Sequence, residues 1–248
     1  MKVSYIVPCY NNEEFVHQSL LSIHCQRMCY PDIEIIVIDD GSTDDSYNEI
    51  CKGTFQKKIL RFERNYGVGA ALNLGFKVAS GDYLCFFAAD DVILVARKTS
   101  EQVSVMKKTN ADLSYYLDRY VGEDEYTMEL VRPTFVPCRY PVFYFLNYII
   151  PKSNWLLHRA LLIKEPINSG SMMITRKAYT KYGGWAEDVL TTDYDLLLRY
   201  AREGAKFQPI PGAPILYRTH PGQCSNRTDQ MSEGEQISKD RNTWKEYY

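Results

Sequence analysis

Apolar runs alternate with amphipathic segments along the first hundred residues of the chain. Short runs rich in Val, Ile, Tyr and Phe predict strands that are buried on both faces. Between them, apolar residues recur three and four positions apart, which predicts helices that pack one face against a sheet. This alternation is typical of an α/β fold with a largely parallel sheet and crossover helices. The predicted strands cover residues 3–7, 33–38, 59–62 and 82–88, and the predicted helices begin near Asn12, Gly67 and residue 94.

The second half of the chain has a less regular pattern. Residues 120–170 mix proline, aromatic and basic residues without a clean period. Within them, Phe143–Ile163 is open to three interpretations: an acceptor-binding wall, an amphipathic helix at a membrane interface, or the packed edge of the domain. Packing is the favoured interpretation. Regular elements return as a strand over 170–175, a helix ending at Gly183-Gly184, a helix opening at Thr192 and a last strand over 210–218.

Polar clusters follow four of the predicted strands. They are residues 8–12, residues 39–44, the pair Asp90-Asp91, and His220. Because the carboxyl ends of neighbouring parallel strands lie at one edge of a sheet, we expect these clusters to meet around one ligand. Aspartate oxygens suit Mg²⁺ or Mn²⁺, which usually share their coordination with substrate phosphates. For Asp90 or Asp91 taken singly, capping of the following helix is an equal alternative.

Composition narrows the class of protein. The chain is 45% hydrophobic and 24% charged, with a formal net charge of −2, which gives no broad attraction for nucleic acid. Its seven cysteines are scattered and form no Cys-x-x-Cys pair, so we expect them to be reduced. The chain opens directly on a predicted strand and has no apolar run of about 20 residues. These features predict a cytoplasmic protein.

Several motifs follow one another along the chain. Those of the first half are Val3–Asn12, Ile38–Asp44, Asn65–Asn73 and Gly81–Asp91, and those of the second half are Gly183-Gly-Trp185, Thr192–Leu196, Arg199 and Tyr217–His220. In this order they resemble glycosyltransferase family 2, and the resemblance covers residues 1–225. It implies a GT-A fold: a Rossmann-like, mostly parallel sheet flanked by helices, with a smaller acceptor-side subregion.

This resemblance implies a reaction and a setting for it. A sugar would move from a nucleoside diphosphate sugar, expected to be UDP-linked, to a glycan or lipid-linked acceptor with inversion at the anomeric carbon. The protein would act in cell-surface polysaccharide assembly, with peripheral association at the inner face of the membrane. Residues 1–110 would form the nucleotide-sugar-binding half of a single domain, residues 111–227 the acceptor-binding and catalytic half, and residues 228–248 a polar, poorly ordered tail.

The resemblance also implies which residues bind the donor. The Tyr10 ring would lie against the base, Asp40 would accept a hydrogen bond from the base, and Asp39 would hold the adjacent loop. Gly67 and Gly69 would allow close approach of the backbone. The full expected donor-binding set is Pro8, Tyr10, Asn12, Asp40, Asn65, Gly67 and Asp90.

The resemblance implies that a metal ion and one carboxylate carry out catalysis. Asp91 would bind Mn²⁺ or Mg²⁺ directly, Asp90 would hold the ribose or orient the metal shell, and His220 would complete the metal or diphosphate site. Asp193 is the candidate general base that takes the proton of the acceptor hydroxyl. Thr192-x-x-Asp195 also fits a capping box, and Asp193 can act as base while those two residues cap the helix.

Two departures from the family pattern keep other functions open. Ala88 stands where the common metal motif has Asp, and Thr192 stands where the base motif has Glu. They motivate a non-catalytic nucleotide-sugar-binding subunit as an alternative. A sugar-nucleotide nucleotidyltransferase is disfavoured, because Pro8–Asn12 replaces the Gly-rich phosphate loop with its basic residue. A processive membrane synthase is disfavoured by the lack of a Gln-x-x-Arg-Trp motif.

Overall fold

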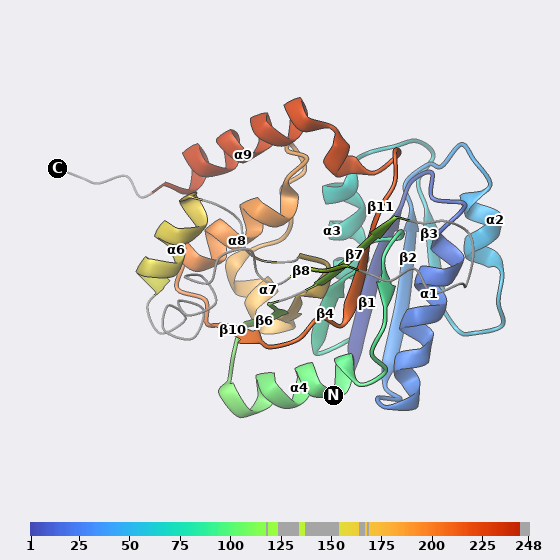
Figure 1. The fold of residues 1–248 in the computed structure, drawn as a ribbon, viewed down its shortest axis with the longest axis horizontal. Helices are drawn as coiled ribbons and strands as arrows, with labels where there is room; N and C mark the ends of the chain where they lie inside the picture. Colours follow the sequence, from blue (N-terminus) through green and yellow to red (C-terminus); the bar gives the residue numbers. More distant parts are fainter. Residues whose placement is uncertain (118, 124–133, 137–153, 164–166, 168, 244–248) are drawn as a thin grey trace.

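A seven-stranded sheet forms the centre of the protein (Figure 1). The computed structural model describes residues 1–117, 119–123, 134–136, 154–163, 167 and 169–243. Six strands run in parallel within two groups, and the seventh lies antiparallel between the groups, which confirms the predicted mostly parallel sheet. The strand order is β10 (Phe207–Ile210), β6 (Leu113–Tyr116), β9 (Met173–Thr175), β4 (Tyr83–Phe86), β1 (Val3–Cys9), β2 (Ile33–Asp39), β3 (Lys58–Arg61).

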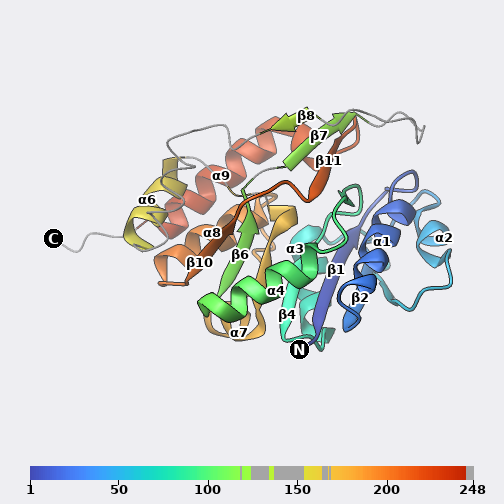
Figure 2. The same cartoon turned by 60° about the horizontal axis from the view of Figure 1, so that its bottom comes forward.

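A second, smaller sheet lies beyond the carboxyl end of β1 (Figure 2). The single strand predicted over residues 210–218 is wrong, because the chain there divides into two strands that belong to different sheets. Pro211 and Pro214 lack a backbone N–H, and Gly212 has a φ of 115°, so this stretch cannot continue a ladder. The order of the small sheet is β5 (Val92–Ile93), β11 (Ile215–Thr219), β7 (Arg119–Glu123), β8 (Thr134–Val136).

Helices cover both faces of the main sheet. Side chains alternate along β1, so Tyr5 packs on one face and Ile6 on the other. Helices α1 (Val16–Cys25) and α4 (Lys98–Thr109) pack on the Tyr5 face. The opposite face is covered by α3 (Val68–Val78), α6 (Asn154–Ile163), α7 (Arg176–Tyr182) and α8 (Thr192–Arg202). The remaining helical elements are α2 (Ser46–Cys51), α9 (Thr228–Asn242) and the 3-10 turns η1 (Gln26–Met28), η3 (Ser169–Ser171) and η4 (Cys224–Asn226).

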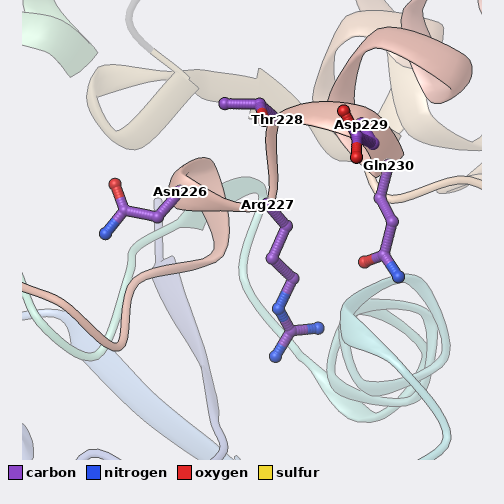
Figure 3. A pocket seen from close by; sticks show the side chains of 5 residues that line it. All are labelled: Asn226, Arg227, Thr228, Asp229 and Gln230. Carbon is purple, nitrogen blue, oxygen red and sulfur yellow. The ribbon is translucent and has the colours of Figure 1, made fainter.

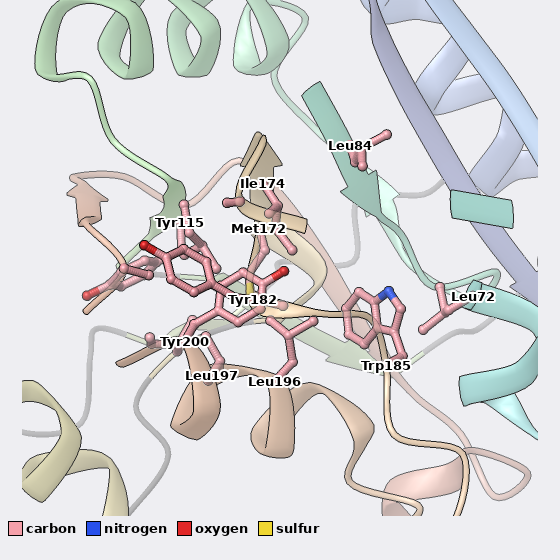
Figure 4. Close-up of a cluster of buried hydrophobic side chains, with 14 of the residues drawn as sticks. Leu72, Leu84, Tyr115, Met172, Ile174, Tyr182, Trp185, Leu196, Leu197 and Tyr200 are labelled. Atoms are coloured by element: carbon pink, nitrogen blue, oxygen red, sulfur yellow. The ribbon is translucent and has the colours of Figure 1, made fainter. Parts of the chain in front are cut away.

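The core on the α8 face is rich in aromatic rings (Figure 4). Tyr182 and Tyr200 lie 5.1 Å apart between ring centroids, and Trp185 packs edge-on against Phe76 of α3 at 5.5 Å. The core therefore ties the segment that leads into α8 to the helix that follows β3. Of Phe143–Ile163, only α6 lies within the described residues, and its Leu157 and Leu161 are buried in this core.

Two local predictions at the ends of helices are wrong. The first helix begins at Val16 rather than after an Asn12 cap, and the Asn12 side chain donates to the Tyr10 carbonyl at 3.1 Å. The segment after Arg227, expected to be poorly ordered, forms α9 across the top of the molecule in Figure 1. Among the described residues, we find no helix with the length and apolar character needed to cross a bilayer.

Candidate active site

Two of the polar clusters meet directly where β1 and β2 end. The Asp40 amide donates to the Cys9 carbonyl at 2.8 Å, and the Thr43 amide donates to Asn11 Oδ1 at 2.9 Å. The Asn12 amide reaches Ser46 Oγ at 2.7 Å. The expectation that residues 8–12 and 39–44 share one edge of the sheet is therefore confirmed.

The other two clusters meet through Asp90 and His220. Nε2 of His220 lies 3.0 Å from Oδ2 of Asp90, although these residues are 130 positions apart in the sequence. The Phe15 ring packs on the His220 ring at 4.5 Å between centroids, which brings this pair to the start of α1. All four polar clusters thus lie around one edge of the fold, as their positions after predicted strands indicated.

Asp40 is buried beneath the turn that opens α3. It is 2% exposed, and its two oxygens accept the amides of Tyr66 at 2.8 Å and Gly67 at 2.9 Å. Desolvation raises the pKa of this carboxyl, and the Asp39 charge adds to the rise, whereas the two amides oppose it. Asp40 therefore fixes the Gly67 turn, a role that the sequence did not indicate.

Asp39 holds the neighbouring loop, as expected. Its Oδ1 accepts the Ser42 amide at 3.1 Å, and its Oδ2 lies 2.9 Å from Nε of Arg61. The residues expected beside the base are more open: Tyr10 is 36% exposed, Pro8 is half-buried, and Asn65 is exposed. Ring surface on Tyr10 is thus accessible to a planar ligand.

The carboxylates of the metal motif have different surroundings. Asp91 is 3% exposed, and its Oδ1 accepts the Arg218 amide at 3.3 Å, whereas the Asp90 side chain is 21% exposed beside His220. Across the part of the chain that the structure describes, no three His, Cys, Asp or Glu side chains group as a metal site. The carboxylate oxygens of Asp90 and Asp91 suit a hard cation such as Mg²⁺ or Mn²⁺, which usually shares its coordination with substrate phosphates.

Arg218 and its neighbours form a support that the sequence did not reveal. Its Nη1 donates to the Asp90 carbonyl at 2.9 Å, its guanidinium lies 5.4 Å over the Phe15 ring, and it also bonds Gln18. Arg218 is 2% exposed. Arg218 stood inside the Tyr217–His220 motif, but nothing in the sequence placed Phe15 or Gln18 beside it.

Asp193 lies in the first turn of α8. It is half-buried, and its Oδ1 accepts the amide of Tyr194 at 2.9 Å. The capping box predicted from Thr192 and Asp195 is wrong, because α8 begins after Thr191 without a side-chain cap. Asp195, in the same first turn, instead accepts Nδ2 of Asn242 from α9 at 3.1 Å.

A cavity of about 350 Å³ lies between the start of α3, the segment before α8 and helix α9. Gly69 allows close approach of α3 and the segment before α8, because a Cβ there would lie 2.1 Å from the Ala186 carbonyl oxygen. The Gly67 turn that Asp40 fixes and the segment leading to Asp193 thus line the same cavity. Its walls are Gly67–Gly69 at the start of α3, residues 187–190 before α8, and Gln230, Glu233, Gly234 and Ile237 from α9.

Comparison with sequence relatives identifies a family. The model of glycosyl transferase family 2 matches residues 4–183. An uncharacterized glycosyltransferase of Rickettsia felis is 28% identical over 204 residues, which cover 81% of this chain and 31% of that protein. An uncharacterized glycosyltransferase of Haemophilus influenzae is 36% identical over 116 residues, covering 46% of this chain and 45% of that protein. The chain thus spans less than half the length of either relative.

Solved structures share the fold at low sequence identity. S. aureus TarS 1–349 in complex with UDP-GlcNAc has a TM-score of 0.69 at 16% identity, covering 96% of this chain and 65% of that one. The mannosyltransferase PcManGT from Pyrobaculum calidifontis, in complex with GDP-Man and Mn²⁺, has a TM-score of 0.73 at 17% identity, covering 98% and 65%. The expected GT-A fold is confirmed.

Proposed function

The chain belongs to glycosyltransferase family 2, and we propose that it transfers a sugar from a nucleoside diphosphate sugar to a hydroxyl of a glycan or lipid-linked acceptor, with inversion. One observation carries the proposal: Asp90 and His220, which are remote in sequence, lie in contact at the edge of the sheet where β1 and β2 end. Open α/β sheets bind their ligands at this edge. A role in cell-surface polysaccharide assembly, at the inner face of the membrane, belongs to the same proposal.

The donor would lie between the first polar cluster and the Gly67 turn. The exposed ring of Tyr10 would stack on the base, and the buried Asp40 would order the turn and accept a hydrogen bond from the base. A carboxylate oxygen has more than one acceptor site, so the amides of Tyr66 and Gly67 leave capacity for a ligand. We propose UDP as the nucleotide, because an imide N–H of uracil donates to such an acceptor.

A divalent cation would be held by Asp91 and His220 together with the diphosphate, and Asp90, in contact with His220, would hold the ribose or orient the metal shell. The ion supplies Lewis-acid stabilisation of the departing phosphate when it is bound. The Arg218 guanidinium fixes the backbone at Asp90, and the Phe15 ring orients the imidazole of His220. These contacts hold the side chains in place before the ligand arrives, which favours binding.

Asp193 would act as the general base. Its position in the first turn of α8 follows directly on the segment that lines the cavity with Gly67–Gly69. As the acceptor oxygen bonds to the anomeric carbon, its proton passes to Asp193 and the bond to the diphosphate oxygen breaks. A positioned base typically contributes about 10²–10⁴-fold to the rate.

Substitution of Asp193 tests this proposal. Purified protein incubated with UDP-sugars and Mn²⁺ should release UDP slowly by hydrolysis, and Asp193→Asn should lower the rate by about 10²–10⁴-fold while UDP affinity stays unchanged. Asp32→Asn, an equal change of charge at an exposed site remote from the cavity, is the matched control. Wild-type turnover in Asp193→Asn would exclude Asp193 as the base.

A non-catalytic nucleotide-sugar-binding subunit is the second candidate. Thr192 is 3% exposed and supplies no carboxylate beside Asp193, and Ala88 supplies none beside Asp90. Under this alternative the wild-type protein binds the nucleotide sugar but releases no nucleoside diphosphate over hours with Mn²⁺ present. The hydrolysis assay therefore separates the two functions.

A further inference from the structure

Arg227 stands at the junction of η4 and α9, next to the proposed donor site. It is the residue before the first turn of α9, and it lines a cavity of about 340 Å³ with Asn226, Thr228, Asp229 and Gln230. Figure 3 shows its side chain extending away from α9 into the space beside α3. Gln230, three residues later, lines the larger cavity together with Gly67–Gly69. The first turn of α9 thus faces the turn that opens α3.

The segment before Arg227 is tied to the metal motif. Asn226 Nδ2 donates to the His220 carbonyl at 2.9 Å and to the Pro221 carbonyl at 3.2 Å, and the His220 amide donates to Gln223 Oε1 at 2.9 Å. This compact turn begins at the residue that contacts Asp90 and ends at Arg227. Its Cys224 thiol has a pKa raised by desolvation and by the Asp90 charge, while Arg227 opposes the rise. The Asp90 carboxylate and the Arg227 guanidinium therefore both lie close enough to Cys224 to influence its thiol.

Arg227 differs from the other arginines of this region in its partners. Arg199, Arg202 and Arg241 each pair with a carboxylate, at 3.4, 3.0 and 2.5 Å. Among the residues that the structure describes, Arg227 has no carboxylate within ion-pair distance. Its guanidinium is exposed toward the cavity, so it can bind an anionic ligand without first breaking an ion pair.

We propose that Arg227 binds the diphosphate of the donor and stabilises the nucleoside diphosphate as it leaves. This inference rests on the proposed function. When the acceptor oxygen bonds to the anomeric carbon, the electron pair of the breaking bond passes to the diphosphate, which gains one negative charge. The guanidinium fork matches two phosphate oxygens. Ala88 stands where the common metal motif has a carboxylate that helps to bind the metal ion, and the positive charge of Arg227 would make up for that lost contribution.

Binding of nucleotides with and without phosphates tests the proposal. Calorimetry with UDP and Mn²⁺ should show about tenfold weaker binding for Arg227→Ala, as loss of a hydrogen bond to a charged group predicts. Affinity for uridine, measured by ligand-observed NMR, should not change. Arg227→Lys should lose less UDP affinity than Arg227→Ala, because lysine keeps the positive charge but lacks the guanidinium fork. GDP and guanosine form the equivalent pair if the protein prefers guanine.

Arg97→Ala is the matched control, since Arg97 is an exposed arginine directly before α4. Helix α4 lies at the opposite side of the molecule from α9 in Figure 1. The Arg97→Ala variant should bind UDP as the wild type does. Equal UDP affinity in Arg227→Ala and wild type would overturn the role of Arg227 and leave the proposed function standing. A wild-type protein that binds neither UDP nor GDP would overturn both. An equal loss for uridine and UDP would show that Arg227 supports the base rather than the diphosphate.

Discussion

At the scale of single residues, Asp40 links loop order to pH. Its carboxylate accepts the Tyr66 and Gly67 amides, and burial holds its pKa above the usual 3.8. The folded protein therefore binds this proton more tightly than the unfolded chain does. The carboxylate lowers stability at pH values above its folded-state pKa, and this contribution vanishes as the pH falls below 3.8.

This shift predicts the pH dependence of nucleotide binding. Protonation of Asp40 replaces an acceptor oxygen with a donor, so UDP affinity should decline on acidification at a higher pH than an unperturbed aspartate would give. Asp40→Asn should bind UDP more weakly at neutral pH and should lack this part of the pH profile. Calorimetry of both proteins from neutral to acid pH measures the difference. Parallel profiles in the two proteins would assign the titration to another group.

The role of a residue was predictable where a sequence motif indicated it. It was not predictable where the role depends on a contact with a residue far away in the sequence. Asp39 holds its loop as the sequence indicated, because both partners lie within one short segment or the adjacent strand. Asp195 was predicted to cap α8, but its partner Asn242 lies 47 positions later on α9. Local spacing carries no information on such a contact.

At the scale of elements, α9 shows why a polar segment can still form a packed helix. The residues that it buries are Gly234, Ser238 and Asn242, four positions apart on one face. They are small or polar, so hydropathy gives no helical signal. Close approach to Thr191 and hydrogen bonds to Asp195 stabilise the contact instead.

Crowding at Gly234 should therefore move α9. A Cβ there would lie 2.8 Å from Oγ1 of the buried Thr191, so Gly234→Leu should lower stability by about 1–3 kcal/mol. If α9 positions Arg227, the same variant should also weaken UDP binding. Thermal unfolding and calorimetry report the two effects. Gln236→Ala, on the exposed face of α9, should change neither, and an unchanged melting temperature in Gly234→Leu would mean that α9 does not depend on this contact.

At the scale of the whole molecule, the parallel half of the sheet was predictable and the small sheet was not. Strands β1, β2 and β4 are largely apolar runs, and crossover segments connect the four parallel strands β1 to β4, which lie side by side in the sheet. The small sheet combines short strands that start at residues 92, 119, 134 and 215, which carry no shared pattern. Their assembly around the Asp90–His220 contact depends on the complete fold.

A ligand that bridges both halves should stabilise the molecule as one unit. We expect UDP or a UDP-sugar with Mn²⁺ to raise the melting temperature. At a ligand concentration of 100 times Kd, the free energy of unfolding should increase by about 2.7 kcal/mol. Removal of the metal by a chelator should reduce the gain from UDP but not from uridine. Equal stabilisation by UDP with and without Mn²⁺ would count against metal-assisted diphosphate binding. GDP and GDP-mannose complete the comparison.

The antiparallel strand β9 has a consequence for synthesis of the chain. Ile174 pairs with both Leu84 of β4 and Leu113 of β6, so the main sheet stays divided until residue 175 has left the ribosome. Until then the emerging polypeptide presents unpaired strand edges, which favour association with other chains. Pairing at such sequence separation is also slow. Nascent chains stopped before β9 should therefore be held by chaperones, and those extended past it should be released.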